Sequence, residues 1–238
     1  IPFMLELLSK VERPSQEAKT LFVEVYTQQI RYLFGYADSA GSESFLDKIK
    51  SDFKVYEPYS MQMIEAVYRS VGFISKDTKQ QASFAIGLLE IALGQLENIS
   101  HDDLASYAKA VSGLSALLEK VADGTSRLDN LLRKTLEDCI YKTEAQINKI
   151  SAKVITGLAE QKDKEDEIDK TLITAKEELA KAVSALAKAR FRVLGSSGVK
   201  LIALYKPSIG KAGVINVFAA LLEAQSLSRR QRSERKII

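Results

Sequence analysis

The chain has 238 residues, of which 46% are apolar and 27% are charged, a composition typical of a folded globular protein. Its single cysteine excludes an intrachain disulfide, and only 4 prolines and 12 glycines leave few positions for turns. The formal net charge is +3, but the last ten residues hold five cations and one acid, so the rest of the chain is nearly neutral. This distribution argues against a general nucleic-acid-binding surface.

Hydrophobic periodicity predicts helices along almost the whole chain. A short helix over residues 3–12 ends before Pro14, and a second, capped by Ser15, runs to about residue 37. A loop over 38–42 precedes a helix over 44–56, and Pro58 opens the next helix. A further helix over 78–99, with Asp77 as its cap, completes the first half of the chain.

The most regular pattern begins after Ser100–Asp103, which resembles a capping box. Apolar residues then recur at spacings of three and four as far as Leu158, as in a coiled-coil helix. The sequence at 123–125 favours a break into two helices, with one unbroken helix as the alternative. The charged segment 160–170 is then the solvated tip of a hairpin, whose second helix continues to about residue 190. The apolar residues of the periodic pattern form a seam along one side of the helix. The first part of this seam consists of Leu104, Tyr107, Val111, Leu114, Leu118 and Val121.

A long segment without acids follows this hairpin. Between Glu178 and Glu223 lie 44 residues with no Asp or Glu, where the average of 31 acids in 238 residues would supply about six. An apolar, cationic segment of this kind suits the boundary between head groups and acyl chains of an anionic membrane. Segments 195–198 and 207–213 divide it into two apolar runs, and neither reaches the roughly 20 residues of an independent membrane-spanning helix. Burial of both runs in the bundle core is the alternative interpretation.

The predicted membrane-contact and lipid-binding residues come from this segment. The apolar set is Phe191, Val193, Leu194, Leu201, Ile202, Leu204, Ile215, Val217, Phe218 and Leu221. The set expected to meet anionic lipid is Arg190, Arg192, Lys200, Lys206 and Lys211.

Motifs for catalysis or metal binding are weak. The glycines near 195–200 and 208–213 do not fit a phosphate loop, because Ala212 stands where the magnesium-binding hydroxyl would be. One histidine, His101, and one cysteine, Cys139, are too few for a zinc, copper or iron–sulfur site. Asp163, Glu165 and their acidic neighbours lack the spacing of an EF-hand. We therefore expect no enzyme, no cofactor and no metal site.

The long helical hairpin, joined to an apolar segment punctuated by glycines, resembles the ClyA-like α-helical pore-forming toxins over roughly residues 78–225. This resemblance is architectural. It implies an elongated bundle whose apolar tongue contacts or enters a membrane. The expected partners are a lipid membrane and other helical subunits, with which the protein would form a homo- or hetero-oligomer. The resemblance also implies that the protein is secreted. Ile1 in place of an initiator Met indicates a processed or trimmed chain.

The sequence thus predicts an all-α, elongated helical bundle with long antiparallel coiled-coil-like helices. Its expected parts are a bundle over 1–190, an apolar acid-free segment over 191–225 and a basic tail over 226–238. The predicted function is that of a membrane-active helical bundle. The alternative is a cytoplasmic, non-catalytic coiled-coil scaffold or a BAR-like membrane-curving domain, although a BAR-like dimer would show a basic face along residues 101–170, where the charges are mixed.

Overall fold

The structure, a computed structural model, describes residues 2–36, 42–70, 79–96, 104–161, 170–195 and 199–234. These residues form α-helices and two short 3₁₀ helices, with no strand among them. The first group is α1 (Pro2–Ser9), α2 (Gln16–Tyr36), α3 (Ser42–Val55), η1 (Glu57–Tyr59), α4 (Ser60–Arg69) and α5 (Lys79–Gly94). The second group is α6 (Leu104–Ala122), η4 (Thr125–Arg127), α7 (Asn130–Gln161), α8 (Lys170–Leu194) and α9 (Val199–Glu234). The predicted all-α bundle is confirmed.

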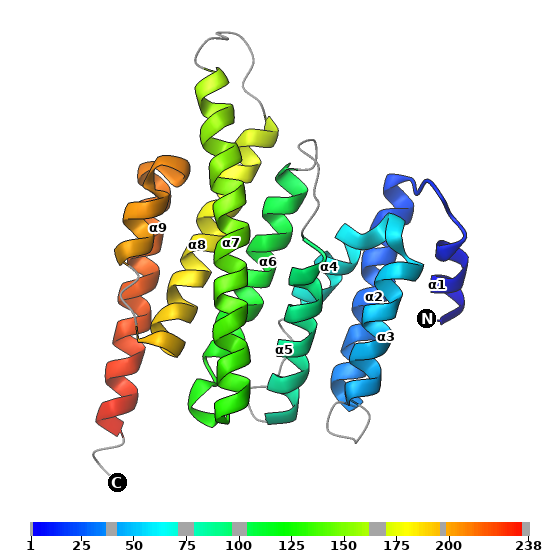
Figure 1. Cartoon of the computed structure of the whole chain (residues 1–238), viewed down its shortest axis with the longest axis horizontal. Coiled ribbons are helices and arrows are strands. Elements are labelled where there is room, and N and C mark those ends of the chain that lie inside the picture. Colours follow the sequence, from blue (N-terminus) through cyan, green and yellow to red (C-terminus); the bar gives the residue numbers. More distant parts are fainter. Residues whose placement is uncertain are drawn as a thin grey trace.

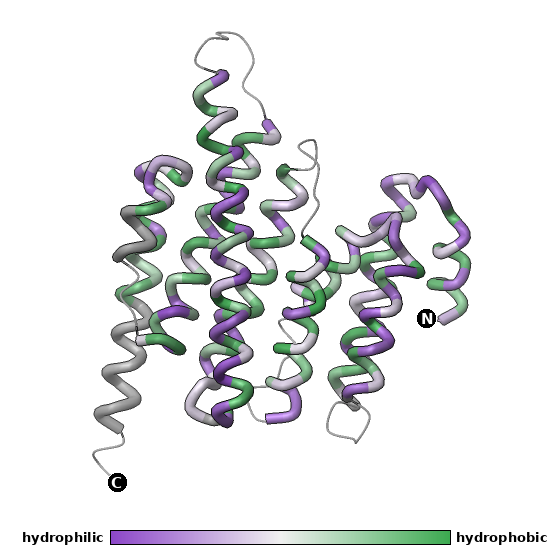
Figure 2. The backbone as a smooth tube through the Cα atoms, viewed as in Figure 1, coloured by the Kyte–Doolittle hydropathy of each residue, from purple (hydrophilic) through white to green (hydrophobic). Residues whose placement is uncertain are grey.

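The helices stand side by side, so the longest dimension of the molecule runs across them (Figure 1). α1, α2 and α3 lie at one end of this row and α9 lies at the other. α4 joins the two parts, because it packs against α2 on one side and against α6 on the other. α6, α7 and α8 form the middle of the row, and hydrophobic stretches alternate with hydrophilic ones along each of them (Figure 2).

The predicted break in the long periodic segment is confirmed. α6 ends at Ala122, Gly124 precedes η4, and α7 begins at Asn130. Asp129 caps α7, because its carboxylate accepts a 2.9 Å hydrogen bond from the backbone N–H of Leu132. The six seam residues of α6 are all buried.

α8 is the helix around which the second half of the molecule packs. It contacts α6, α7 and α9, and alanines fill most of its buried positions. Small side chains let neighbouring helices approach closely, which explains how one helix accommodates three neighbours. The buried alanines of α8 are Ala175, Ala182, Ala185, Ala187 and Ala189.

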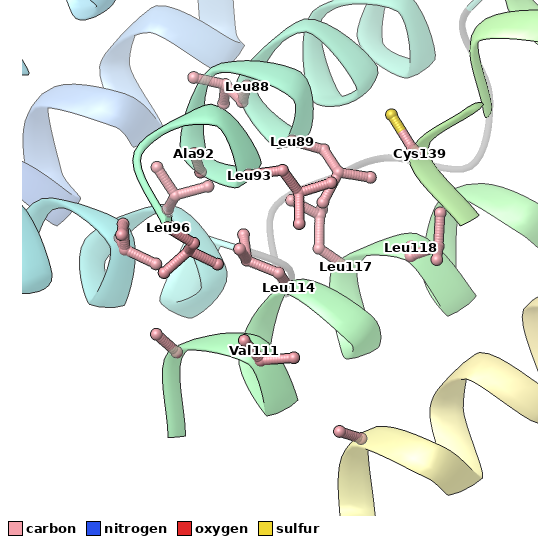
Figure 3. Close-up of a cluster of buried hydrophobic side chains, with 14 of the residues drawn as sticks. Leu88, Leu89, Ala92, Leu93, Leu96, Val111, Leu114, Leu117, Leu118 and Cys139 are labelled. Carbon is pink, nitrogen blue, oxygen red and sulfur yellow. The ribbon is translucent and has the colours of Figure 1, made fainter. Parts of the chain in front are cut away.

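The core between α5, α6 and α7 consists of interdigitated leucines (Figure 3). Leu89 and Leu93 of α5 lie against Leu117 of α6, and Cys139 of α7 belongs to the same buried cluster. Cys139 is fully buried. In a core packed this closely, a change in the volume of any side chain lowers the stability of the fold.

The first part of the chain has its own aromatic core. Phe22 and Tyr59 stack with ring centroids 4.3 Å apart, and Phe22 also stacks on Tyr26 at 5.4 Å. The Tyr26 hydroxyl donates a 3.1 Å hydrogen bond to the buried carboxylate of Asp52, which also accepts from Lys48 at 3.2 Å. These contacts hold α3 and η1 against α2.

Several predicted boundaries differ from the structure or lie outside its described residues. α5 ends at Gly94, earlier than the predicted residue 99, because Gln95 and Leu96 form turn hydrogen bonds back to α5. α8 continues past residue 190 to Leu194, and α9 includes residues 226–234 of the predicted tail. Most of the charged tip, the cap Asp77 and the capping box with His101 lie outside the described residues.

Replacement of Gly113 by alanine should destabilise the protein. A Cβ atom at this position of α6 would lie 2.1 Å from Cγ of the Tyr68 ring, so α4 and α6 would have to separate. We expect the free energy of unfolding to fall by about 1–3 kcal/mol in urea denaturation followed by circular dichroism. Gly35→Ala in α2 is the control, because nothing lies within 4 Å of its new methyl group. Equal stability of Gly113→Ala and wild type would contradict the close packing.

The Cys139 thiol should react only when the protein opens. Burial raises its pKa to about 12, so the reactive thiolate is scarce at pH 8. We expect a chromogenic disulfide reagent to label the native protein slowly, at a rate that increases with urea concentration. Complete labelling within the mixing time in the absence of urea would show that this core position is accessible.

Candidate functional site on the surface of α9

Gly210 divides α9 into two arms, residues 199–209 and 211–234. Its backbone has φ +69° and ψ −176°, a conformation that is essentially restricted to glycine. The chain turns over here, so that the two arms run in opposite directions (Figure 1). The arms meet closely at the turn, because a Cβ atom on Gly213 would lie 2.7 Å from Cβ of Ile209. The predicted division at 207–213 is thus a helical hairpin.

The other predicted division begins at Gly195, which ends α8. Its φ of +61° is the left-handed conformation that commonly follows the last turn of a helix. The next three residues of this division, 196–198, lie outside the described residues.

The first arm is fixed to α7 by buried polar contacts. The Tyr205 hydroxyl donates a 2.6 Å hydrogen bond to the side-chain oxygen of Asn148. Burial, with a smaller effect of the Glu144 carboxylate, raises the pKa of Tyr205, so this hydroxyl remains a donor. Ser151 donates to the Ser208 hydroxyl at 2.9 Å, and Ser208 in turn donates to the Tyr205 carbonyl at 2.9 Å.

The second arm packs its small and apolar side chains against α8. Val217 and Leu221 are buried, and Gly213 brings the arm within contact distance of Ala180. This face belongs to the protein core, so these two predicted membrane-contact residues are not accessible in this conformation.

The opposite face of the second arm is an exposed apolar stripe. Ile215 is 67% exposed, Phe218 46% and Leu222 65%. Their spacing of three and four places them on one side of a helix, and Lys211 lies one turn before Ile215 on that side. We call Lys211, Ile215, Phe218 and Leu222 the α9 stripe. Leu222 is absent from the predicted set, although its helical spacing from Phe218 could have identified it.

The other predicted apolar residues have different positions. Leu204 on the first arm is exposed, whereas Phe191, Val193 and Leu194 are half-buried at the end of α8. The side chains of Leu201 and Ile202 lie outside the described part of the structure. The structure therefore brings Ile215 and Phe218 together in one stripe and separates them from the others.

The predicted lipid-binding cations also fall into two groups, those that form ion pairs within the fold and those that are exposed. Arg190 forms an ion pair with Glu144 of α7, and Arg192 pairs at 2.9 Å with Asp123, the residue that follows α6. Lys206 and Lys211 are exposed, and the side chain of Lys200 is not among those described. In the segment without acids between Glu178 and Glu223, the arginines near the end of α8 form ion pairs with acids from α7 and from the end of α6. The two exposed lysines on α9 have no ion pair among the described residues.

The described residues offer neither a membrane-spanning helix nor a cluster of metal ligands. No helix in this part of the chain combines the length and the apolar content needed to cross a membrane. No three or more His, Cys, Asp or Glu side chains gather there in a way that could hold a metal ion.

Comparison of the chain with protein-family models, with curated proteins and with solved structures finds no match.

Removing the Ser208 hydroxyl should loosen the hairpin from α7. Ser208→Ala leaves the buried Ser151 hydroxyl without its acceptor, whereas Ser151→Ala leaves Ser208 bonded to the Tyr205 carbonyl. We expect a loss in the free energy of unfolding of about 1–2 kcal/mol for Ser208→Ala and a smaller loss for Ser151→Ala. The double variant should lose less than the sum of the two. Additive losses in urea denaturation would show that the two hydroxyls do not interact.

Proposed function

We propose that the protein binds the surface of anionic membranes through the α9 stripe. The observation that carries this proposal is the combination, on one helix face, of three exposed apolar side chains with an exposed lysine that has no ion pair within the described part of the chain. No acid occurs from residue 179 to residue 222, so nothing on this arm up to Leu222 repels an anionic lipid. A helix of this type lies in the interface with its apolar side chains among the upper acyl chains.

The stripe is large enough for reversible binding. Each of Ile215, Phe218 and Leu222 stabilises the bound state by roughly 1–2 kcal/mol when its exposed part leaves water. A lysine close to an anionic surface adds about 1 kcal/mol, and salt screens this contribution. Binding through the stripe alone is therefore expected to be weak and dependent on salt.

The resemblance to ClyA-like toxins suggests a further step. If α9 entered the membrane, the second arm would have to leave α8, and Val217 and Leu221 would then join Ile215 and Phe218 as lipid contacts. Gly210 is the natural pivot for this movement, because glycine crosses between backbone conformations at little cost. Contact by the stripe requires no such movement, so contact and insertion are separate events that an experiment can distinguish.

Substitution of the stripe should abolish binding to vesicles. We expect the wild-type protein to sediment with vesicles rich in phosphatidylglycerol, and Ile215→Asp and Phe218→Asp each to weaken this binding at least tenfold. Lys211→Gln should reduce binding to these vesicles and leave any binding to neutral phosphatidylcholine vesicles unchanged. Dye release in the same samples tests the insertion step, since contact alone releases no dye.

Leu131→Asp is the matched control for this experiment. Leu131 is 74% exposed on α7, so the change has the same chemistry on an exposed apolar residue outside α9. Circular dichroism should show intact helices in all variants, because every substituted residue is exposed. Absence of wild-type binding, or an equal loss in Leu131→Asp, would overturn the proposal.

A further inference from the structure

A polar cleft lies at the junction of the two parts of the molecule, away from α9. α4 and α6 form its walls and the first turns of α2 close one end, consistent with the position of α4 between these helices (Figure 1). Its volume is about 510 Å³, which is enough for a small organic molecule. Most of the residues that surround it are polar, in contrast to the leucine core beside it.

The cleft is hollow because α6 presents small side chains toward α4. Ser106 and Ala110 line it, and Gly113 follows on the same face one turn later. The Tyr68 ring fills the space above Gly113, as the 2.1 Å approach to a Cβ at that position shows. Tyr68 therefore closes that end, and the space over Ser106 and Ala110 stays open.

At the Tyr68 end of the cleft, the lining cation Lys109 shares its carboxylate partner with Arg69, a residue outside the lining. Arg69 and Lys109 lie 2.7 Å and 3.2 Å from the same carboxylate oxygen, Oε1 of Glu65. The Tyr68 hydroxyl donates to this oxygen at 3.5 Å, and burial, with the Glu65 carboxylate, raises the pKa of Tyr68. One carboxylate thus neutralises one of two cations, and the ammonium of Lys109 keeps donors for another acceptor.

The α2 end of the cleft adds a second lining cation. Lys19 of α2 is half-buried in the lining and has no ion pair among the described residues. Glu57 of η1 adds a carboxylate to the lining, and Gln62 of α4 adds an amide. The lining therefore offers cations for an anionic group, and acceptors for hydroxyl or amino groups of the same ligand.

We propose that this cleft binds a small organic molecule that carries a phosphate or carboxylate group and additional hydrogen-bond donors. The anionic group takes donors from Lys109 and Lys19, and the hydroxyl or amino groups of the ligand donate to Glu57 and Gln62. This site does not depend on the α9 stripe, and ligand binding here requires no membrane.

Nuclear magnetic resonance titration with two probes tests the site. Inorganic phosphate represents the anionic group, and glycerol 3-phosphate adds two hydroxyl donors. We expect both to shift the backbone amide signals of residues 16–19, 60–62 and 106–109, with glycerol 3-phosphate binding several-fold more tightly. Tighter binding of phosphate, or shifts elsewhere only, would overturn the assignment.

Two variants separate a built site from general surface charge. Lys109→Gln should weaken the binding of glycerol 3-phosphate at least tenfold, and Ser106→Trp should block the cleft without a change in charge. Lys181→Gln is the control, because Lys181 is an exposed lysine paired with Glu178 at 2.7 Å on the distant α8. Circular dichroism checks that all three variants are folded. Equal affinities in Lys109→Gln, Lys181→Gln and wild type would show that phosphate binds adventitiously.

Discussion

The packing of α8 against its neighbours is the interaction on which the second half of the structure depends. Its alanines allow close approach, and its cations meet acids of the adjoining helices across the same interfaces. Lys188 lies 3.2 Å from Glu119 of α6, and Arg192 contacts Asp123 at the end of that helix. These side chains are mostly shielded from solvent, so the pairs fix the register of α8 on α6 more firmly than exposed pairs would. The position of α9 follows, because α9 packs on α8.

The packing of α8 explains why the segment without acids contains both paired and exposed cations. The segment without acids between Glu178 and Glu223 predicts a cationic surface. A sequence, however, shows only which charges are near one another along the chain. The acids that pair with Arg190 and Arg192 are far away along the chain, Glu144 on α7 and Glu119 and Asp123 on α6 and just after it. Only the later part of the segment, with Lys206 and Lys211, presents the exposed cations that the pattern predicts.

Periodicity and helix-ending residues made most of the fold predictable. The break near Gly124 and the end of α8 at Gly195 both follow from local backbone preferences. The parts that sequence could not provide depend on tertiary contacts. The cleft between α4 and α6 results from small residues on one helix opposite Tyr68 on another, and no local pattern links positions 68 and 113.

The second arm of α9 shows why the choice between core and surface was ambiguous. Its residues are apolar on two sides, so its sequence does not distinguish the face that contacts α8 from the face that does not. A helix that packs on one neighbour needs only one apolar face, as Val217 and Leu221 provide. The second face, with Ile215 and Phe218, is largely left in water and adds exposed apolar area. The membrane contact that we propose would remove this apolar area from water, and the neighbouring lysines suit a surface with negative charge.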